Sequence, residues 1–278
     1  MTLDDKFPAK RAFITGAASG LGLAICERLA ARGWNLLLAD INGTRLASTA
    51  HKLREEGATV LSEIIDVTEY SSLEQAAATV EREWGGVDLV FNNAGIAAAG
   101  AMEEISLAEW GNVLAVDLWS VIYGCKAFLP LLKRQGGGHI INTASSAGTL
   151  AGPEMAAYNV AKAGVVSLSE TLRVELSDQQ IGVTVICPTV FVTSLGESLK
   201  GNRDMERKLL MQLERSRVSA DAIVDDVVAA ILRDRLYVMT QHDAKWGWRL
   251  KRYFPELYTR LMANLYRNKK WIFAEAES

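Results

Sequence analysis

The chain has 278 residues, of which 49% are hydrophobic and 23% are charged, and its formal net charge is −3 at pH 7. These values are typical of a globular protein with enough apolar side chains for a large core, and they give no reason to expect a nucleic-acid partner. Residues 1–10 contain two acids and no apolar run, so we expect no signal peptide. No window approaches the ~20 uninterrupted apolar residues that a membrane-spanning helix needs.

Short apolar or β-branched runs alternate with longer helical patterns from the N-terminus onward. Strands are predicted at 11–15, 35–39, 60–65, 87–91, 139–143 and 183–187, and helices at 21–31, 44–56, 73–84, 107–132 and 154–176. This alternation predicts βαβ units and a parallel sheet covered on both faces. The sequence therefore predicts an α/β fold with a doubly wound, Rossmann-like sheet. No repeat or linker divides residues 1–240, which we expect to form one domain, followed by a C-terminal helical extension at 241–278.

The first predicted strand is followed by a glycine-rich turn that opens the first predicted helix. Gly16 would let the chain turn off the strand, Gly20 would let the backbone approach a pyrophosphate, and Gly22 would allow close packing of helix on sheet. The amide groups at the start of the helix would face the anion. Because this strand–turn–helix context is the one that a dinucleotide site requires, we predict cofactor contacts here, with Ser19 and Leu21 included.

Asp40 ends the second predicted strand, about twenty residues further on. A carboxylate at this place accepts hydrogen bonds from the ribose hydroxyls and repels a 2′-phosphate. Ile41 and Asn42 bring no positive charge, although Arg45, one turn into the next helix, could swing back. The pattern favours NAD over NADP. As an alternative, Asp40 could cap that helix, which is compatible with the same role.

The order of the remaining motifs resembles the short-chain dehydrogenase/reductase family, in its single-domain branch, over about residues 10–195. The turn has the family's spacing Gly-x-x-x-Gly-x-Gly, and the sequence Tyr-x-x-x-Lys follows at 158–162. The resemblance implies catalytic roles for Ser145, Tyr158 and Lys162. It implies cofactor contacts for Tyr158 and Lys162 and for a further set of residues at strand ends: Asp66, Val67, Asn93, Ala94, Gly95, Pro188, Val190 and Thr193.

The chemistry of the predicted pair can be argued from the residues themselves. Tyr158 and Lys162 are four residues apart on a predicted helix and so share one face. A free phenol has a pKa of about 10, and a neighbouring ammonium favours the phenolate and lowers that pKa. Tyr158 could then take the proton from an alcohol, or return it to a ketone, while Ser145 holds the substrate oxygen. No cluster of metal ligands is visible.

Two positions depart from the family pattern. Asp117 stands where the family usually has an asparagine that helps to hold a proton-relay water, and Thr189 stands where glycine usually follows Pro188. We expect Asp117 to keep the relay role, which depends largely on its backbone carbonyl. Its carboxylate could instead pair with Lys162 and moderate the effect of that ammonium on Tyr158. Thr189 would constrain the loop beside the nicotinamide.

The substrate region is predicted to be apolar. Residues 149–155 carry one acid, and Val190, Phe191, Leu195 and Leu199 precede an apolar helical run at 208–211, a region that resembles the family's substrate lid. An apolar lining favours a hydrophobic or bulky alcohol or ketone. The resemblance also implies a homodimer or homotetramer built through the helices at 107–132 and 154–176.

The C-terminal extension is basic and aromatic. Eight Lys or Arg residues between positions 245 and 270 oppose the single acid Glu256, and Pro255 is placed to begin a helix. Such an amphipathic helix could lie on an anionic membrane surface, or it could pack on its own domain or on a sister subunit.

The three cysteines, Cys26, Cys125 and Cys187, are far apart and lie in apolar runs. We expect buried free thiols in a reducing, cytoplasmic compartment. Two functions remain open: a working NAD-dependent oxidoreductase, and a dinucleotide-binding regulator or scaffold with little catalysis.

Overall fold

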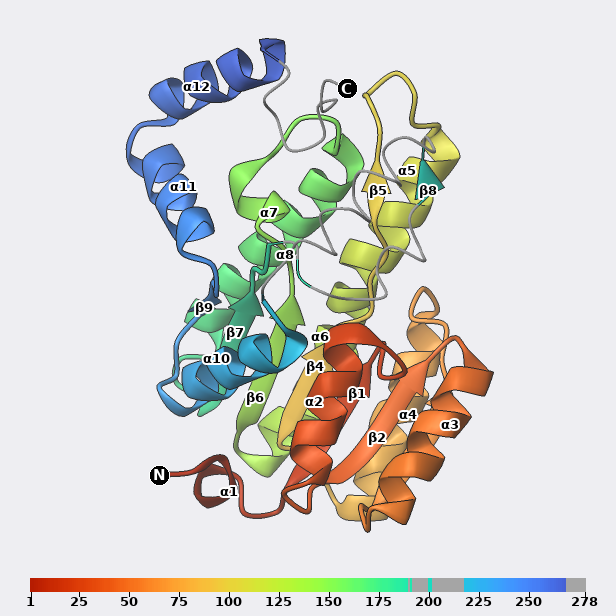
Figure 1. The fold of residues 1–278 in the computed structure, drawn as a ribbon. Helices are drawn as coiled ribbons and strands as arrows, with labels where there is room; N and C mark the ends of the chain where they lie inside the picture. The colour runs from red at the N-terminus through yellow and green to blue at the C-terminus, as the bar shows by residue number, and fades with distance from the viewer. Residues whose placement is uncertain (190, 192–199, 202–217, 269–278) are drawn as a thin grey trace.

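The computed structural model describes residues 1–189, 191, 200–201 and 218–268. Its centre is a seven-stranded sheet in the order β3-β2-β1-β4-β6-β7-β9 (Figure 1). All neighbouring strands in it are parallel. The strands are β1 (Arg11–Thr15), β2 (Asn35–Asp40), β3 (Val60–Ile64), β4 (Leu89–Asn92), β6 (Gly138–Thr143), β7 (Ile181–Ile186) and β9 (Tyr237–Val238). The strand order reverses between β1 and β4, and such a switch point is where ligands bind in open α/β sheets.

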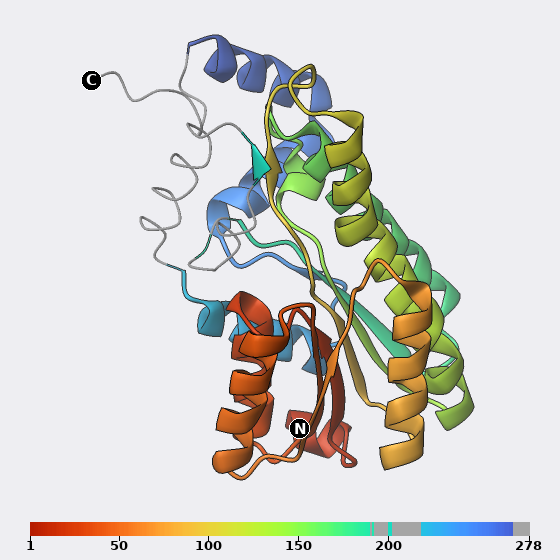
Figure 2. The same cartoon turned by 90° about the vertical axis from the view of Figure 1, so that its right-hand side faces the viewer.

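Helices cover both faces of the sheet, as a doubly wound fold requires (Figure 2). One face carries α2 (Gly20–Ala30), α3 (Gly43–Glu55) and α10 (Ala220–Leu232), and the other carries α4 (Tyr70–Trp84), α6 (Ser120–Gln135) and α8 (Ala156–Glu175). The predicted fold class is therefore confirmed.

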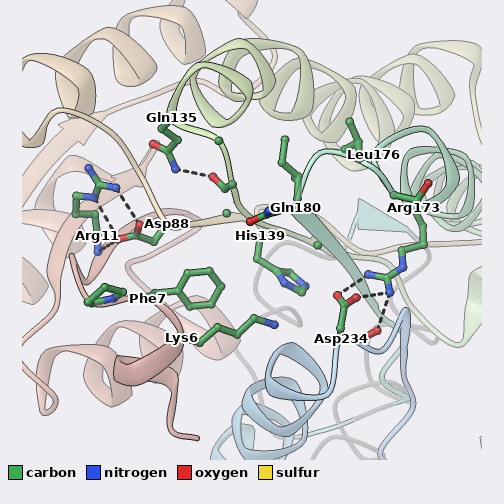
Figure 3. A pocket seen from close by; sticks show the side chains of 17 residues that line it. Lys6, Phe7, Arg11, Asp88, Gln135, His139, Arg173, Leu176, Gln180 and Asp234 are labelled. Carbon is green, nitrogen blue, oxygen red and sulfur yellow. Dashed lines mark hydrogen bonds and ion pairs between the residues drawn. The ribbon is translucent and has the colours of Figure 1, made fainter.

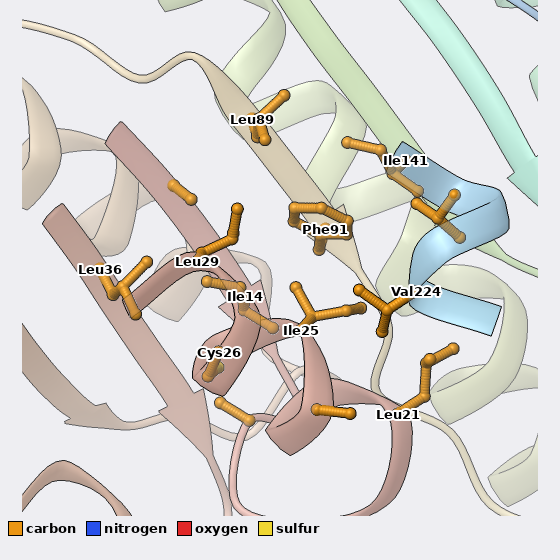
Figure 4. Close-up of a cluster of buried hydrophobic side chains, with 14 of the residues drawn as sticks. Ile14, Leu21, Ile25, Cys26, Leu29, Leu36, Leu89, Phe91, Ile141 and Val224 are labelled. Carbon is orange, nitrogen blue, oxygen red and sulfur yellow. The ribbon is translucent and has the colours of Figure 1, made fainter. Parts of the chain in front are cut away.

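The core lies in two layers because successive side chains of each strand point to opposite faces. On one face, Ile14 of β1 packs with Ile25 of α2 and Val224 of α10 (Figure 4). On the other, Phe13 stacks on Phe128 of α6 with ring centroids 4.4 Å apart. Since the strands are buried on both sides, they read in the sequence as near-continuous apolar runs.

Several short elements have no periodic signal in the sequence. They are α1 (Leu3–Lys6), α7 (Ala147–Leu150), and the two-residue strands β5 (Ala98–Ala99) and β8 (Lys200–Gly201), which pair with each other outside the main sheet. The strand β9 and helix α10 were also not predicted. Strands of two residues are too short for alternation to show.

The helix predicted at 107–132 is interrupted. It consists of α5 (Leu107–Leu114), a π-helical turn η1 (Ala115–Trp119) and α6. By length and composition alone, the stretch Leu107–Gln135 could cross a membrane. Its buried side chains, including Val121 and Leu132, instead pack into the second layer of the core, so it is a core helix of this domain.

The C-terminal extension forms α11 (His242–Tyr253) and α12 (Pro255–Arg267), and Pro255 occupies the first turn of α12 as predicted. Tyr258 of α12 is buried, and its hydroxyl donates to the Leu150 carbonyl at 2.9 Å. The extension therefore packs in part on its own domain. Leu257, Leu261 and Leu265, one turn apart from each other, remain exposed.

The cysteine prediction is confirmed in structural terms. Cys26, Cys125 and Cys187 are all buried free thiols. Burial raises the pKa of Cys125 and of Cys187 to about 12, so these thiols are neutral near pH 7. A thiol in that state behaves as a small hydrophobic side chain.

Candidate active site

A cleft of about 430 Å³ opens at the carboxyl ends of β1, β2, β4, β6 and β7. It lies at the switch point between β1 and β4, where the sheet order predicts a ligand. Most of the predicted cofactor residues line it together: Gly16, Ser19, Gly20, Leu21, Asp40, Asp66, Val67, Asn93, Ala94, Gly95, Tyr158, Lys162 and Pro188. Gly22 lies beside the cleft, in the first turn of α2. Val190 and Thr193 lie outside the described residues.

The glycine-rich turn has the geometry that its residues predict. Gly16 and Gly20 have φ angles of +64° and +53°, which side-chain-bearing residues rarely adopt. A Cβ atom on Gly22 would lie 2.1 Å from the Gly16 carbonyl oxygen, so only glycine allows α2 to approach β1 this closely. Ser19 precedes α2 without capping it through its side chain. The amide groups of the first turn are thus left to a ligand, and an anion is their natural partner.

Asp40 is held beside the glycine-rich turn, at the edge of the cleft, by the backbone around it. Its Oδ2 accepts from the Ala18 N–H at 3.0 Å and its Oδ1 from the Asn42 N–H at 2.9 Å. The helix α3 is capped by Asn42, whose side chain accepts from the Arg45 N–H at 3.0 Å. The alternative in which Asp40 caps that helix is therefore wrong. Two backbone bonds instead fix the carboxylate at the edge of the cleft.

Asn93 ties three strand ends together. Its backbone N–H donates to the Thr15 hydroxyl at 2.9 Å, and its side-chain amide donates to the Thr15 carbonyl at 3.0 Å. Its side-chain oxygen accepts from the Thr143 hydroxyl at 3.2 Å. Because β1, β4 and β6 are linked in this way, the floor of the cleft is built on rigid elements.

Tyr158 and Lys162 lie on one face of α8, as their spacing predicts, and both are buried. The Lys162 ammonium is 5.6 Å from the centroid of the Tyr158 ring and donates to the Thr143 carbonyl at 3.2 Å. Ser145 lies beside Tyr158, and its hydroxyl donates to the Pro188 carbonyl at 3.4 Å. The three residues expected to be catalytic are therefore close together, and Tyr158 and Lys162 line the cleft.

The acidity of Tyr158 reflects opposing influences. Burial raises its pKa, Lys162 and the bond from Ser145 lower it, and Asp117 raises it. The lowering by Lys162 that the sequence predicts is present, but burial outweighs it. The pKa of Tyr158 in this structure consequently lies above the ordinary value for a phenol.

Asp117 lies in the π-helical turn η1 and is fully buried. Its Oδ1 is 3.0 Å from the Lys162 ammonium and accepts from the Ile96 N–H at 3.1 Å. The pairing with Lys162 that the sequence left as an alternative is therefore confirmed, and the relay role stays a prediction. Single π-helical turns are frequent at functional sites, but no pattern in the sequence marks this one.

Thr189 adopts an ordinary backbone conformation. Its φ angle is not positive. Its N–H donates to the Gln241 side-chain oxygen at 3.2 Å. Threonine is accommodated here because the position does not use glycine's conformational freedom.

Some cleft residues were missed by sequence reasoning. They are Ile65, Ile96, Val116, Thr143 and Ala144. Four of them lie at or after a strand end that carries a predicted residue, which was the available signal, whereas Val116 adjoins Asp117 in the π-helical turn η1.

A second hollow, of about 610 Å³, lies at the opposite end of the sheet, where the strands begin (Figure 3). Its arginines, Arg11 and Arg173, pair with Asp88 and Asp234 respectively. Burial lowers the pKa of His139, which also lines it, to about 3, so this histidine is neutral. None of the predicted site residues lies here, and among the described residues no three potential metal ligands gather.

Comparison with known proteins agrees with this geometry. The family model described as short chain dehydrogenase matches residues 10–204. The chain belongs to the short-chain dehydrogenase family. Its parallel sheet flanked by helices is the fold of this family.

Individual relatives differ in what their names say they act on. D-threitol dehydrogenase of Mycolicibacterium smegmatis is 35% identical over 69% of this chain and 74% of its own length. The 1-deoxy-11-beta-hydroxypentalenate dehydrogenase of Streptomyces avermitilis is 30% identical over 96% of this chain and 95% of its own. A short-chain dehydrogenase/reductase from Burkholderia phymatum, solved in complex with NAD, has a TM-score of 0.85 at 33% identity and covers 88% of this chain and 94% of its own. This short-chain dehydrogenase thus resembles oxidoreductases that act on alcohol or ketone groups.

Proposed function

We propose that this protein is an NAD-dependent oxidoreductase that interconverts a hydrophobic secondary alcohol and the corresponding ketone. The observation that carries the proposal is the buried pair of Tyr158 and Lys162, which lines a glycine-lined cleft with the partly buried Ser145 beside Tyr158. The positive-φ glycines, the close approach at Gly22 and the uncapped start of α2 fit a dinucleotide in that cleft.

Each residue of the group has a distinct task. In the oxidation direction the Tyr158 phenolate takes the proton from the alcohol hydroxyl, and in reduction the Tyr158 hydroxyl returns it to the ketone oxygen. The Ser145 hydroxyl donates to the substrate oxygen and orients it. The Lys162 ammonium stabilises the phenolate electrostatically. A bound nicotinamide would supply the hydride exchange at the substrate carbon.

The preference for NAD is supported by the fixed carboxylate of Asp40. Both of its oxygens are oriented by backbone N–H groups, so the side chain is preorganised at the edge of the cleft. It would accept from ribose hydroxyls and repel a 2′-phosphate.

The preference for a hydrophobic substrate is supported by Ile96, Val116 and Phe191, which line the cleft with Tyr158. Apolar walls with a few directed polar groups are typical of sites for small organic ligands. Leu195 and Leu199, also predicted to line the substrate region, lie outside the described residues. The named relatives include both a D-threitol dehydrogenase and a 1-deoxy-11-beta-hydroxypentalenate dehydrogenase.

The test compares the protein with its Tyr158→Phe variant in a screen of hydrophobic secondary alcohols with NAD, following the absorbance of the reduced cofactor. We expect turnover in the wild type and a loss of about 10³-fold or more in the variant, because acid–base catalysis is typically worth 10²–10⁴-fold. NAD binding, measured by calorimetry, is expected to be retained. A matched control is Tyr123→Phe, which removes a phenol hydroxyl on α6 and is expected to leave turnover unchanged.

The competing function is a dinucleotide-binding regulator or scaffold. NAD binding without turnover across polyols and hydrophobic alcohols, and no difference between wild type and Tyr158→Phe, would favour it over the oxidoreductase.

The buried free thiols support a further proposal, that the protein works in the reducing environment of the cytoplasm. We also propose that it is a homo-oligomer assembled through α5, α6 and α8. Exposed Trp119, the last residue of η1 before α6, and exposed Val160 on α8 support an interface there. Analytical ultracentrifugation of Val160→Glu against wild type tests this arrangement: an unchanged mass would contradict it.

We also propose that the exposed strip of α12, which consists of Leu257, Leu261 and Leu265, binds a surface that does not belong to its own subunit. Arg260 and Arg267 flank it on the same helix, so an anionic membrane fits its chemistry, as does a sister subunit. Co-sedimentation with anionic liposomes separates the two, with Leu261→Glu as the variant. Equal pelleting of both proteins would rule out the membrane, and a lower oligomeric mass of the variant would identify the sister subunit.

A further inference from the structure

We propose that Asp117 is a positioning residue that offsets the positive charge of Lys162, so that alcohol oxidation by this protein requires a higher pH than it would with an uncharged residue at 117. The inference rests on the proposed function, because it concerns how Tyr158 gains and loses its proton. It assigns to the unusual carboxylate an electrostatic role.

The contacts of Asp117 allow the effect of its charge to be distinguished from the effect of its hydrogen bonds. Oδ1 makes both of its contacts, with the Lys162 ammonium at 3.0 Å and with the Ile96 N–H at 3.1 Å. Oδ2 is buried and has no hydrogen-bond partner among the described residues. An asparagine could place its amide oxygen at Oδ1 and keep both contacts, with its NH₂ group where Oδ2 now lies. Relative to asparagine, the carboxylate makes no additional contact and adds a negative charge when ionised; burial raises its pKa, and Lys162 and the Ile96 N–H oppose that rise.

This charge acts where screening by water is weak. Asp117 is 0% exposed and Lys162 is 2% exposed, and charges interact more strongly in the protein interior than in water. Lys162 attracts the negative charge of a Tyr158 phenolate, whereas Asp117 repels it. A buried acid next to the lysine thus opposes the stabilisation that the lysine gives to the catalytic base.

Groups on the other surrounding elements do not replace this effect. Tyr158 and Lys162 face Asp117 from α8, and the Ile96 N–H faces it from the segment after β4. Cys187, after β7, faces Lys162, but burial raises the pKa of this thiol to about 12, so it is neutral. Of the described residues, Asp117 is the carboxylate that acts on both Lys162 and Tyr158.

The neighbouring backbone is built around the pair. A Cβ atom on Gly95 would lie 2.7 Å from Asp117 Oδ1 and 3.3 Å from the Lys162 ammonium. Glycine at this position lets the chain after β4 pass in direct contact with the ion pair. The pairing is therefore part of the packed site rather than a contact between mobile side chains.

The test is the pH profile of turnover in both directions for wild type and Asp117→Asn, with Asp88→Asn as a matched control. Asp88 is also a buried acid in an ion pair, with Arg11, but at the opposite end of the sheet. We expect the acidic limb of oxidation to move to lower pH in Asp117→Asn by on the order of one unit, which is about tenfold in rate on that limb. The basic limb of ketone reduction should move the same way, and Asp88→Asn should move neither.

A second readout does not depend on turnover. Ultraviolet-difference titration of tyrosinate, with the same titration of Tyr158→Phe subtracted, follows the proton of Tyr158 itself, both in the wild-type protein and in the Asp117→Asn variant. It therefore tests the electrostatic inference even if no alcohol is oxidised. Circular dichroism checks folding, and Asp117→Ser provides a second uncharged variant.

Unshifted limbs and an unshifted Tyr158 titration in Asp117→Asn would overturn the proposal, as would equal shifts in Asp88→Asn. A uniform loss of rate at every pH, with no shift, would also overturn it and would favour a proton-relay role for Asp117. Turnover that is absent in wild type, together with a shifted titration, would leave this inference standing and remove the proposed function.

Discussion

Cofactor choice can be tested at Asp40, where the structure permits a magnitude to be worked out. The carboxylate is held by two backbone N–H groups at 3.0 and 2.9 Å, so it cannot easily turn away from a ligand. A hydrogen bond to a charged group contributes about 1.5–3 kcal/mol, which Asp40→Ala would remove from NAD binding. Repulsion between two unit charges about 4 Å apart costs about 1–4 kcal/mol near a protein surface, and the same substitution would relieve it for NADP.

Together these effects predict a change of about 2.5–7 kcal/mol in cofactor preference, or on the order of 10²- to 10⁵-fold in the ratio of kcat/KM for NAD to that for NADP. The assay is steady-state kinetics with each cofactor at saturating alcohol. Glu63→Ala is the matched control, because Glu63 lies on the neighbouring strand beside Ala39 but does not line the cleft. The reasoning would be refuted by a ratio that stays within about twofold, or by an equal change in the control.

Two further predictions concern packing and charge. Gly22→Ala would place a Cβ 2.1 Å from the Gly16 carbonyl oxygen. We therefore expect the free energy of unfolding, measured in urea, to fall by about 1–3 kcal/mol and the affinity for NAD, measured by calorimetry, to weaken. Unchanged values of both would contradict the close approach. Arg173 lowers the pKa of Asp234, so the pair stabilises the fold above the ordinary aspartate pKa and this contribution is lost as the pH falls through the lowered value. Because both side chains are partly exposed, Arg173→Ala should cost about 1 kcal/mol or less at pH 7, and its unfolding curves should converge with those of wild type in acid.

The fold was predictable because its main elements are long or buried on both faces. The runs around Phe13 and Leu37 read as continuous apolar strands since neither face meets water. The elements that could not be predicted depend on contacts between residues that are far apart in the chain. The two residues of β9 pair with β7 after a long excursion of the chain, and no local pattern marks so short a strand.

The site was predictable where local geometry alone dictates the residue. Gly16 and Gly20 mark a turn with positive φ angles, and the spacing of Tyr158 and Lys162 places them on one helical face. The net acidity of Tyr158 was not predictable from that spacing, because it depends on burial and on a carboxylate from another helix. Asp117, which pairs with Lys162, likewise lies in a π-helical turn that no pattern in the sequence marks.

Two ion pairs lie at opposite ends of the sheet. The pair of Asp88 and Arg11 is suited to stabilising the fold, whereas the pair of Asp117 and Lys162 is suited to influencing catalysis. Asp88 uses both carboxylate oxygens on Arg11, at 2.9 and 3.1 Å, and an arginine side chain does not release its proton in proteins. Asp117 uses a single oxygen on a lysine, whose compact ammonium also faces the phenol of Tyr158. Removing either partner of the first pair would leave an uncompensated buried charge and change stability. Removing the charge of Asp117 likewise leaves the buried Lys162 ammonium without a carboxylate. Because this ammonium faces Tyr158, the change also reaches the group that moves the proton.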